Sequence, residues 1–121
     1  MVTFQRFEDI LAWQKARELT KVVYGFTSNG PAVRDFGYRD QIRGAAVSSM
    51  SNIAEGFDRD TDKEFQRFLF ISRASASEVQ SLLYVALDQN YLNKEKFFEL
   101  YLLAGEVKKL VGGLIHSLGK S

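Results

Sequence analysis

The stretch NKEKFFELYLLAGEVKKLVGGLIHSL, residues 93–118, has the most regular apolar pattern in the chain. Its apolar residues recur at alternating intervals of three and four, at Phe97, Leu100, Ala104, Val107, Val111, Leu114 and Leu118. A 3.5-residue repeat is typical of a helix that packs nearly parallel to its neighbours with a left-handed twist. Asn93 is a favourable N-cap residue, and Gly119 is suited to ending a helix. We therefore expect a helix over residues 94–118.

Upstream of this helix, three other segments show a one-sided apolar pattern with helical spacing. The first ends before Pro31, which is the only proline in the chain. The third begins behind Thr61 and Glu64, whose Thr-x-x-Glu spacing is that of a capping box. No segment alternates with a two-residue period between turns, so no strand is predicted. The predicted helices cover about residues 8–28, 38–56 and 62–88.

Four helices with short connections favour an all-α fold, namely an antiparallel up-down-up-down four-helix bundle. The length of 121 residues suits a single domain over residues 1–121. The second and third helices also have strips of small residues, which allow two backbones to approach closely. We expect these two helices to pack closely along Ala45, Ser48, Ser49, Asn52 and Gly56 of one and residues 72–77 of the other.

The composition excludes several kinds of site and destination. The chain has no cysteine, which excludes disulfides, cysteine-ligated metals and thiol nucleophiles. Its single histidine, His116, has Gly113 three residues before it, so the Glu-x-x-His motif of di-iron bundles is absent. We expect no cofactor. No apolar stretch approaches 18 residues and the start lacks the features of a signal peptide, so we expect a soluble, cytoplasmic protein without a membrane partner.

No enzymatic activity and no small-molecule substrate are predicted, because the nucleotide-binding, serine-hydrolase and zinc-protease motifs are all absent. Glu55 and Glu78 lie near the strips of small residues, but acid–base catalysis there would need a nucleophile or a second histidine. We interpret Asn52, Glu55 and Glu78 as polar groups that bond between helices or across a subunit boundary.

The aromatic content is high for a small bundle, with ten phenylalanines and five tyrosines. The apolar stripes of the helices already fill the core with mostly aliphatic residues, so several aromatic side chains must lie outside it. Large apolar groups on a surface mark a subunit or partner interface. We therefore predict self-association, with Phe70, Tyr84, Phe98 and Tyr101 as the best candidates for the interface.

The charges are nearly balanced, with 16 basic and 15 acidic residues spread along the chain. Basic residues gather locally where the second predicted helix meets the third, and again on the first helix. Such residues either contact phosphates or lie on a solvated face, and the sequence leaves both interpretations open. The two groups are Arg59, Lys63 and Arg67, and Lys15, Arg17 and Lys21.

Several short motifs, in this order and spacing, resemble the bacterial four-helix bundle family, also called 23S rRNA intervening-sequence proteins. They are FEDI at residues 7–10, WQKA at 13–16, QIR at 41–43 with AAVS at 45–48, SNIAEG at 51–56 with Arg59, and EF at 64–65 with FL at 68–69. The chain departs from the family pattern at Gly44, where a second arginine is common, at Ser49-Met50 in place of Ile-Pro, and at Ala74-Ser75 in place of Gly-Ser.

The resemblance implies a small all-α bundle that assembles as a homopentamer and has no known enzymatic activity. It also implies kinship with accessory proteins of diversity-generating retroelements, which look like binders of nucleic acid and reverse transcriptase. We therefore expect an oligomer that binds RNA or a ribonucleoprotein through basic residues repeated around one end, or alternatively a structural or protein-binding oligomer. The predicted basic residues are Arg39, Arg43, Arg59, Lys63 and Arg67.

Overall fold

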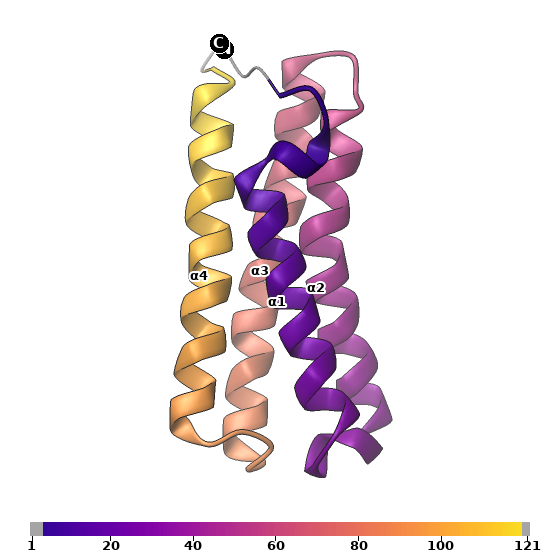
Figure 1. Ribbon diagram of the computed structural model, residues 1–121, viewed down its shortest axis with the longest axis vertical. Helices are drawn as coiled ribbons and strands as arrows, with labels where there is room; N and C mark the ends of the chain where they lie inside the picture. Colours follow the sequence, from indigo (N-terminus) through magenta and orange to yellow (C-terminus); the bar gives the residue numbers. More distant parts are fainter. Residues whose placement is uncertain (1–3, 120–121) are drawn as a thin grey trace.

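The computed structural model describes residues 4–119, and these residues form four long helices and no strand. The helices are α1 (Leu11–Ser28), α2 (Phe36–Phe57), α3 (Asp62–Asp88) and α4 (Lys94–Ser117). They run alternately down and up the molecule, and each packs beside its neighbours in the sequence (Figure 1). Helix α4 also packs against α1, which closes the bundle and places α1 diagonally opposite α3. The predicted all-α four-helix bundle is confirmed.

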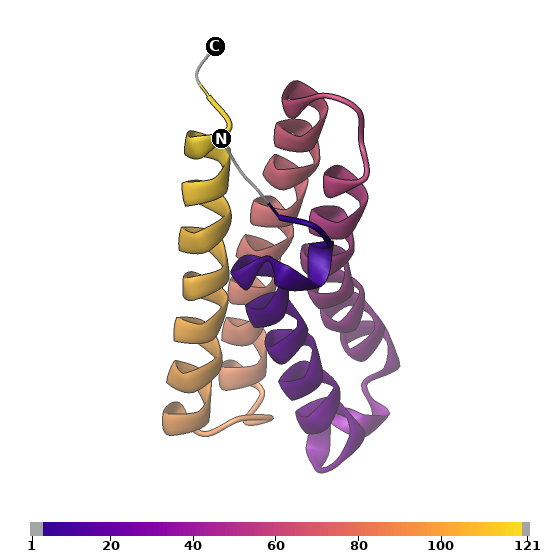
Figure 2. The same cartoon turned by 45° about the horizontal axis from the view of Figure 1, so that its top comes forward.

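The first long helix begins at Leu11, three residues later than the sequence pattern predicts. Phe7–Asp9 form a short 3-10 helix, η1, and Ile10 is extended with φ −79° and ψ 119°. Ile10 is almost completely buried, so the break turns its side chain into the core. The segment before it then packs against the end of α2 (Figure 2).

The connection between α1 and α2 contains a second 3-10 helix, η2 (Pro31–Arg34), after Gly30 with φ 74°. Helix α2 begins at Phe36 rather than at residue 38, because the Asp35 carboxylate accepts the backbone N–H of Tyr38 at 3.3 Å and caps the helix. The other carboxylate oxygen of Asp35 accepts the Tyr91 hydroxyl at 2.6 Å. Asp35 thereby ties the start of α2 to the α3–α4 connection.

The Tyr38 hydroxyl donates to the backbone carbonyl of Leu82 at 2.8 Å, which adds a direct link from α2 to α3. Burial raises the pKa of this hydroxyl well above its usual value, because the phenolate would lose its hydration. The group therefore remains a neutral donor throughout the physiological range.

Side-chain caps begin the last two helices where the sequence places them. The Thr61 hydroxyl accepts the backbone N–H of Glu64 at 3.1 Å. The Asn93 side chain accepts the backbone N–H of Lys96 at 2.8 Å. Each cap satisfies one of the N–H groups that a helix start leaves unpaired.

A close contact between α2 and α3 lies at Gly56, where the packing leaves no room for a side chain. A Cβ atom built there would lie 2.7 Å from the Cβ of Phe68 and 2.9 Å from the ring of Phe65. Further along the same seam, the buried Ser72 hydroxyl donates to the backbone carbonyl of Ser49 at 2.6 Å. The predicted close packing of the small-residue strips is therefore present, and hydrogen bonds reinforce it.

The substitution Gly56→Ala should destabilise the fold by about 1–3 kcal/mol, because the new methyl group overlaps the backbone-proximal atoms of Phe68 and Phe65. Gly44→Ala is the matched control in the same helix, where nothing lies within 4 Å of the added Cβ. It should stabilise the protein by about 0.5–1 kcal/mol, because alanine has the better helix propensity. Urea unfolding followed by circular dichroism measures both, and a Gly56→Ala variant as stable as Gly44→Ala would contradict this packing.

Candidate functional site

The five basic residues predicted to bind RNA do not form one patch. Arg39 and Arg43 lie near the start of α2, whereas Arg59, Lys63 and Arg67 lie around the connection from α2 to α3. Arg43 and Arg59 are 16 residues apart, which corresponds to about 24 Å along a helix. The expectation of a single basic ring at one end of the bundle is therefore wrong.

The guanidinium of Arg43 is engaged inside the fold. Its Nε donates to the hydroxyl of the buried Thr27 and its Nη2 to the hydroxyl of Ser28, each at 2.8 Å. The group also lies 4.3 Å from the centre of the Tyr24 ring. A cation at the C-terminal end of α1 interacts favourably with the helix dipole. Arg43 therefore joins α1 to α2, with its Nε and one Nη2 donor engaged inside the fold.

Arg39 is held in a similar way at the same end of the bundle. Its Nη1 donates to the backbone carbonyl of Val33 at 3.1 Å, and its guanidinium lies 4.8 Å from the centre of the Phe36 ring. The only carboxylate near it among the described residues is that of Asp40, at 3.7 Å. Arg39 thus supports the connection before α2 more than it presents charge to a ligand.

At the other end, carboxylates outnumber the three cations. Residues 55–67 contain Arg59, Lys63 and Arg67 against Glu55, Asp58, Asp60, Asp62 and Glu64, so three positive and five negative charges give a net charge of −2. Arg67 forms an ion pair with Glu64 at 3.2 Å and holds the pKa of that carboxyl below its usual value through this hydrogen bond. A polyanion would be repelled from this end.

The other predicted basic group, on α1, divides between two faces. Lys15 turns toward α4 and pairs with Glu18 at 3.5 Å and with Glu106 at 3.8 Å. Arg17 and Lys21 are exposed and belong to no ion pair within residues 4–119.

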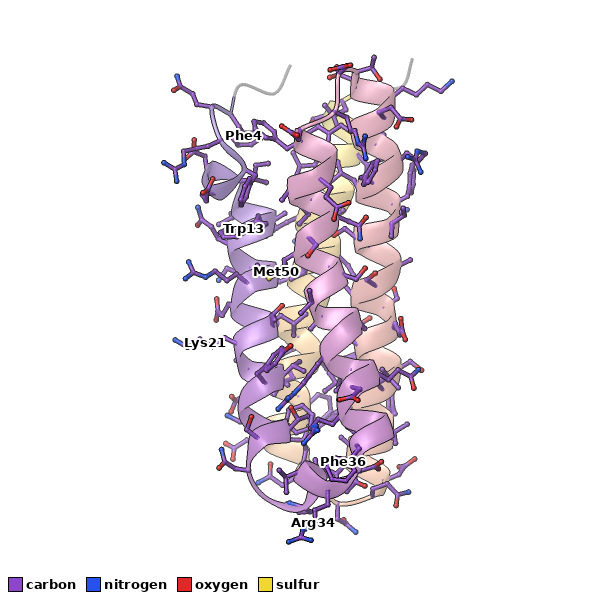
Figure 3. The ribbon with its side chains drawn as sticks, turned by 90° about the vertical axis from the view of Figure 1, so that its right-hand side faces the viewer. Phe4, Trp13, Lys21, Arg34, Phe36 and Met50 are labelled. Carbon is purple, nitrogen blue, oxygen red and sulfur yellow. The ribbon has the colours of Figure 1, made fainter. Side chains whose placement is uncertain are left out.

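Arg17 and Lys21 share their side of the bundle with two aromatic rings. Arg17 lies 5.8 Å from the centre of the Trp13 ring system, and Lys21 projects from the bundle (Figure 3). Helix α2 carries no carboxylate between Asp40 and Glu55. We call Trp13, Arg17, Lys21 and the exposed Tyr24 the α1–α2 face.

Three of the four aromatic residues predicted for a subunit interface are strongly exposed. The exposed fractions are 49% for Phe70, 50% for Tyr84 and 58% for Phe98. Tyr101 is only partly exposed, because it packs beneath Tyr84 with a ring distance of 5.8 Å. Ten large apolar residues are exposed within the described part of the chain, and half of them lie along the outer side of α3 and at the start of α4. We call these five the α3 surface: Phe70, Ile71, Tyr84 and Val85 of α3 and Phe98 at the start of α4.

The three predicted polar groups differ in their contacts. Glu78 accepts the side-chain amide of Gln41 at 3.3 Å and so bonds between α3 and α2. The amide of Asn52 donates instead within its own helix, to the carbonyl and hydroxyl of Ser48 at 2.9 and 3.0 Å. The Ser48 hydroxyl continues this chain of bonds to the Ser75 hydroxyl on α3, at 2.8 Å.

Glu55, the third of these groups, is exposed near the end of α2. It lines a hollow of about 480 Å³ with Arg6 and Phe7 of the N-terminal segment. Its carboxylate thus faces solvent beside this segment rather than the interior between helices.

Within residues 4–119, no three His, Cys, Asp or Glu side chains are placed to hold a metal ion. His116 is exposed near the end of α4. No helix in this part of the chain is both long and apolar enough to cross a membrane.

Two features of these surfaces are not predicted from the sequence. The bonds from Arg43 to Thr27 and Ser28 join residues of two helices, and no local motif indicates them. Leu102 is 70% exposed, the largest exposed fraction among the large apolar residues of the described chain. Its place outside the 3.5-residue stripe of α4 could have revealed it.

Comparison with known proteins places this architecture in a recognised group. A structure with the same fold is the 1.70 Å crystal structure of a protein of unknown function from the S23 ribosomal protein family of Bacteroides thetaiotaomicron. The two chains are 22% identical and superimpose with a TM-score of 0.79, over 87% of this chain and 98% of the other. No match was found among curated proteins.

The fold thus defines a four-helix bundle of the S23 type. The family model described as 23S rRNA-intervening sequence protein matches residues 8–113. The chain belongs to this family, as its motifs indicate. Neither the family description nor the description of the structural neighbour names an enzymatic activity.

The substitution Arg43→Lys should destabilise the fold by about 1.5–3 kcal/mol, because lysine keeps the charge but cannot donate to both hydroxyls in the same planar geometry. Arg17→Lys is the control, since Arg17 is exposed and hydrogen-bonds to no described side chain. It should change stability by less than about 0.5 kcal/mol. If thermal unfolding shows equal stability for the two variants, Arg43 does not join the helices as described.

Proposed function

We propose that this protein is a non-enzymatic homo-oligomer, with five copies as the family resemblance implies. The observation that carries the proposal is the α3 surface, which leaves Phe70, Tyr84 and Phe98 about half exposed. Aromatic residues are enriched in the buried centres of interfaces, because each buries a large area with few rotatable bonds.

The composition of this surface supports a permanent interface. Along the outer side of α3, Ala74, Ser77 and Ser81 separate the two bulky apolar pairs, and Glu78 is the only charged residue between Arg73 and Asp88. Glu78 is itself hydrogen-bonded to Gln41. A surface with so few charges can lose its water at little electrostatic cost.

In solution we expect a mass near five times the 13.8 kDa of one chain, measured by light scattering at micromolar concentration. The substitution Phe98→Asp should reduce the assembly to smaller species, because it would bury a carboxylate in the interface. Phe36→Asp is the matched control: Phe36 is 60% exposed but lies at the start of α2, where a carboxylate favours the helix. A wild-type mass of one chain would overturn the proposal.

A second proposal concerns the partner, for which RNA is the candidate because the family is described as 23S rRNA-intervening sequence protein. The α1–α2 face supports an RNA-binding role, because Arg17 and Lys21 are exposed and free of ion pairs within the described chain, and arginine guanidinium groups lie over the neighbouring Trp13 and Tyr24 rings. Two cations per chain are few, but an oligomer repeats them and multivalency raises the overall affinity. The alternative is a structural or protein-binding oligomer with no nucleic-acid role.

Filter binding of a structured RNA at two salt concentrations separates these proposals. The double variant Arg17→Gln/Lys21→Gln should weaken binding about tenfold or more and flatten its salt dependence. The control variant Arg59→Gln/Lys63→Gln should leave binding almost unchanged, because those cations lie among carboxylates. Absence of binding at low salt would leave the structural or protein-binding role.

A further inference from the structure

We propose that the α3 surface of one copy binds the groove between α1 and α4 of a second copy, so that the subunits join through two different faces. This inference rests on the proposed self-association and adds which surfaces meet.

The groove between α1 and α4 contains two separate hollows. The upper one lies toward the C-terminal end of α4, at the top of Figure 1. Its volume is about 230 Å³, and its apolar lining includes Leu11, Leu110 and Gly113. Gly113 leaves the space open, since nothing lies within 4 Å of a Cβ built there. The lower hollow, of about 380 Å³, has the apolar Val22, Leu100, Leu102 and Leu103 in its lining, together with two lysines and three glutamates at its rim. Leu11 and Leu102 are 51% and 70% exposed, so both hollows have unburied apolar edges.

The four bulky residues that α3 itself contributes to the α3 surface form two pairs, whose spacing is similar to that of the hollows. Phe70 and Ile71 are 14 residues from Tyr84 and Val85, about 21 Å along the helix. The α4 residues that line the hollows are centred near positions 113 and 101, about 18 Å apart.

The pairs and the hollows also lie at the same levels along the bundle. Gln66 of α3 donates to the carbonyl of Ile115 at 2.8 Å, which places the Phe70 pair level with the upper hollow. The ring of Tyr84 lies 4.9 Å from that of Phe97 and 5.8 Å from that of Tyr101, which places the lower pair level with the lower part of the lower hollow. Rotation about an axis parallel to the helices does not shift a copy along the bundle. Each apolar pair of one copy therefore faces one hollow of the next.

The remaining shapes and charges are complementary as well. The exposed Leu102 lies near the level of Ser81, because the neighbouring Gln80 donates to the carbonyl of Tyr101 at 3.2 Å. Ser81 is a small residue between the two bulky pairs of α3. Arg67 precedes the α3 surface and Asp88 follows it, whereas Asp9 lies beside the upper hollow and Lys96 lines the lower one. In residues 4–119, neither aspartate is in an ion pair, so both are available to a neighbouring copy. Arg67 and Lys96 pair with Glu64 and Glu99 of their own chain, at 3.2 and 3.4 Å, and would share these contacts with the neighbour's aspartates.

These two surfaces are on different sides of the molecule, because α1 and α3 occupy diagonal positions. Contact between unlike faces is heterologous, and it forms a closed ring when the repeated rotation adds up to a full turn, as the proposed five copies require. Pairing of the α3 surface with itself would instead stop at a two-fold dimer.

Mixing two interface variants tests the inference. Tyr84→Asp should disable the α3 surface and Leu102→Asp the groove, and each variant alone should have the mass of one chain. Both positions are at least half exposed, so folding should persist, and circular dichroism checks it. An equimolar mixture should form particles of two chains and no larger, because each pair retains one intact α3 surface and one intact groove.

The inference is overturned if the wild type assembles but the mixed variants remain single chains, or if Leu102→Asp assembles like the wild type. Those results would leave the proposed self-association standing. If the wild type is itself a single chain, both proposals fail.

Charge reversal provides a second test, with substitutions that should not disturb folding. Asp88→Lys and Lys96→Glu should each weaken assembly about two- to fivefold, and the two substitutions in one chain should restore it. Lysine suits the C-terminal end of α3 and glutamate the first turn of α4, so neither change opposes its helix dipole. Failure of the double variant to recover would contradict the Asp88–Lys96 contact.

Discussion

The close approach of α2 and α3 at Gly56 is the constraint on which the rest of the structure depends. The two helices nearly touch there, with the Cβ of Phe68 only 2.7 Å from the place a side chain would occupy. The serine hydroxyls along the seam bond to the opposite helix, so the contact is specific in register as well as tight. Helices α1 and α4 pack against this pair and against each other, which completes the bundle.

The close packing along this seam also bears on which side chains are left on the surface. Aliphatic residues such as Ile53, Leu69, Val79 and Val107 fill most of the interior, and a few rings, such as Phe65 and Phe97, are buried with them. Other rings find no room there and lie on the surface. The excess of aromatic residues in the sequence thus becomes an exposed surface on α3 and on the start of α4. Exposed apolar surfaces of this kind are typical of interaction sites, which is why we propose that the chain assembles through it.

Local sequence signals predict most of the fold. The caps at Thr61 and Asn93 are recognisable because each lies a fixed number of residues before an apolar stripe. The start of α1 is predicted too early, because Glu8 and Asp9 resemble a helix start while the burial of Ile10 breaks the helix after them. The prediction of one basic patch is wrong for two reasons. The sequence does not show that the length of α2 separates Arg43 from Arg59, and it does not show that Arg43 bonds to Thr27 and Ser28. Such contacts join distant segments and need the tertiary structure.

The central claim is that copies of this chain meet through unlike faces, and the absence of cysteine allows a direct measurement. A Ser81→Cys chain and a Leu102→Cys chain can be assembled together in equal amounts, treated with a short bifunctional maleimide and separated by denaturing electrophoresis. We predict covalent species of two chains from the mixture, whereas each single-cysteine chain alone should remain uncoupled. Coupling of either single-cysteine chain to itself, or no coupling in the mixture, would contradict the claim.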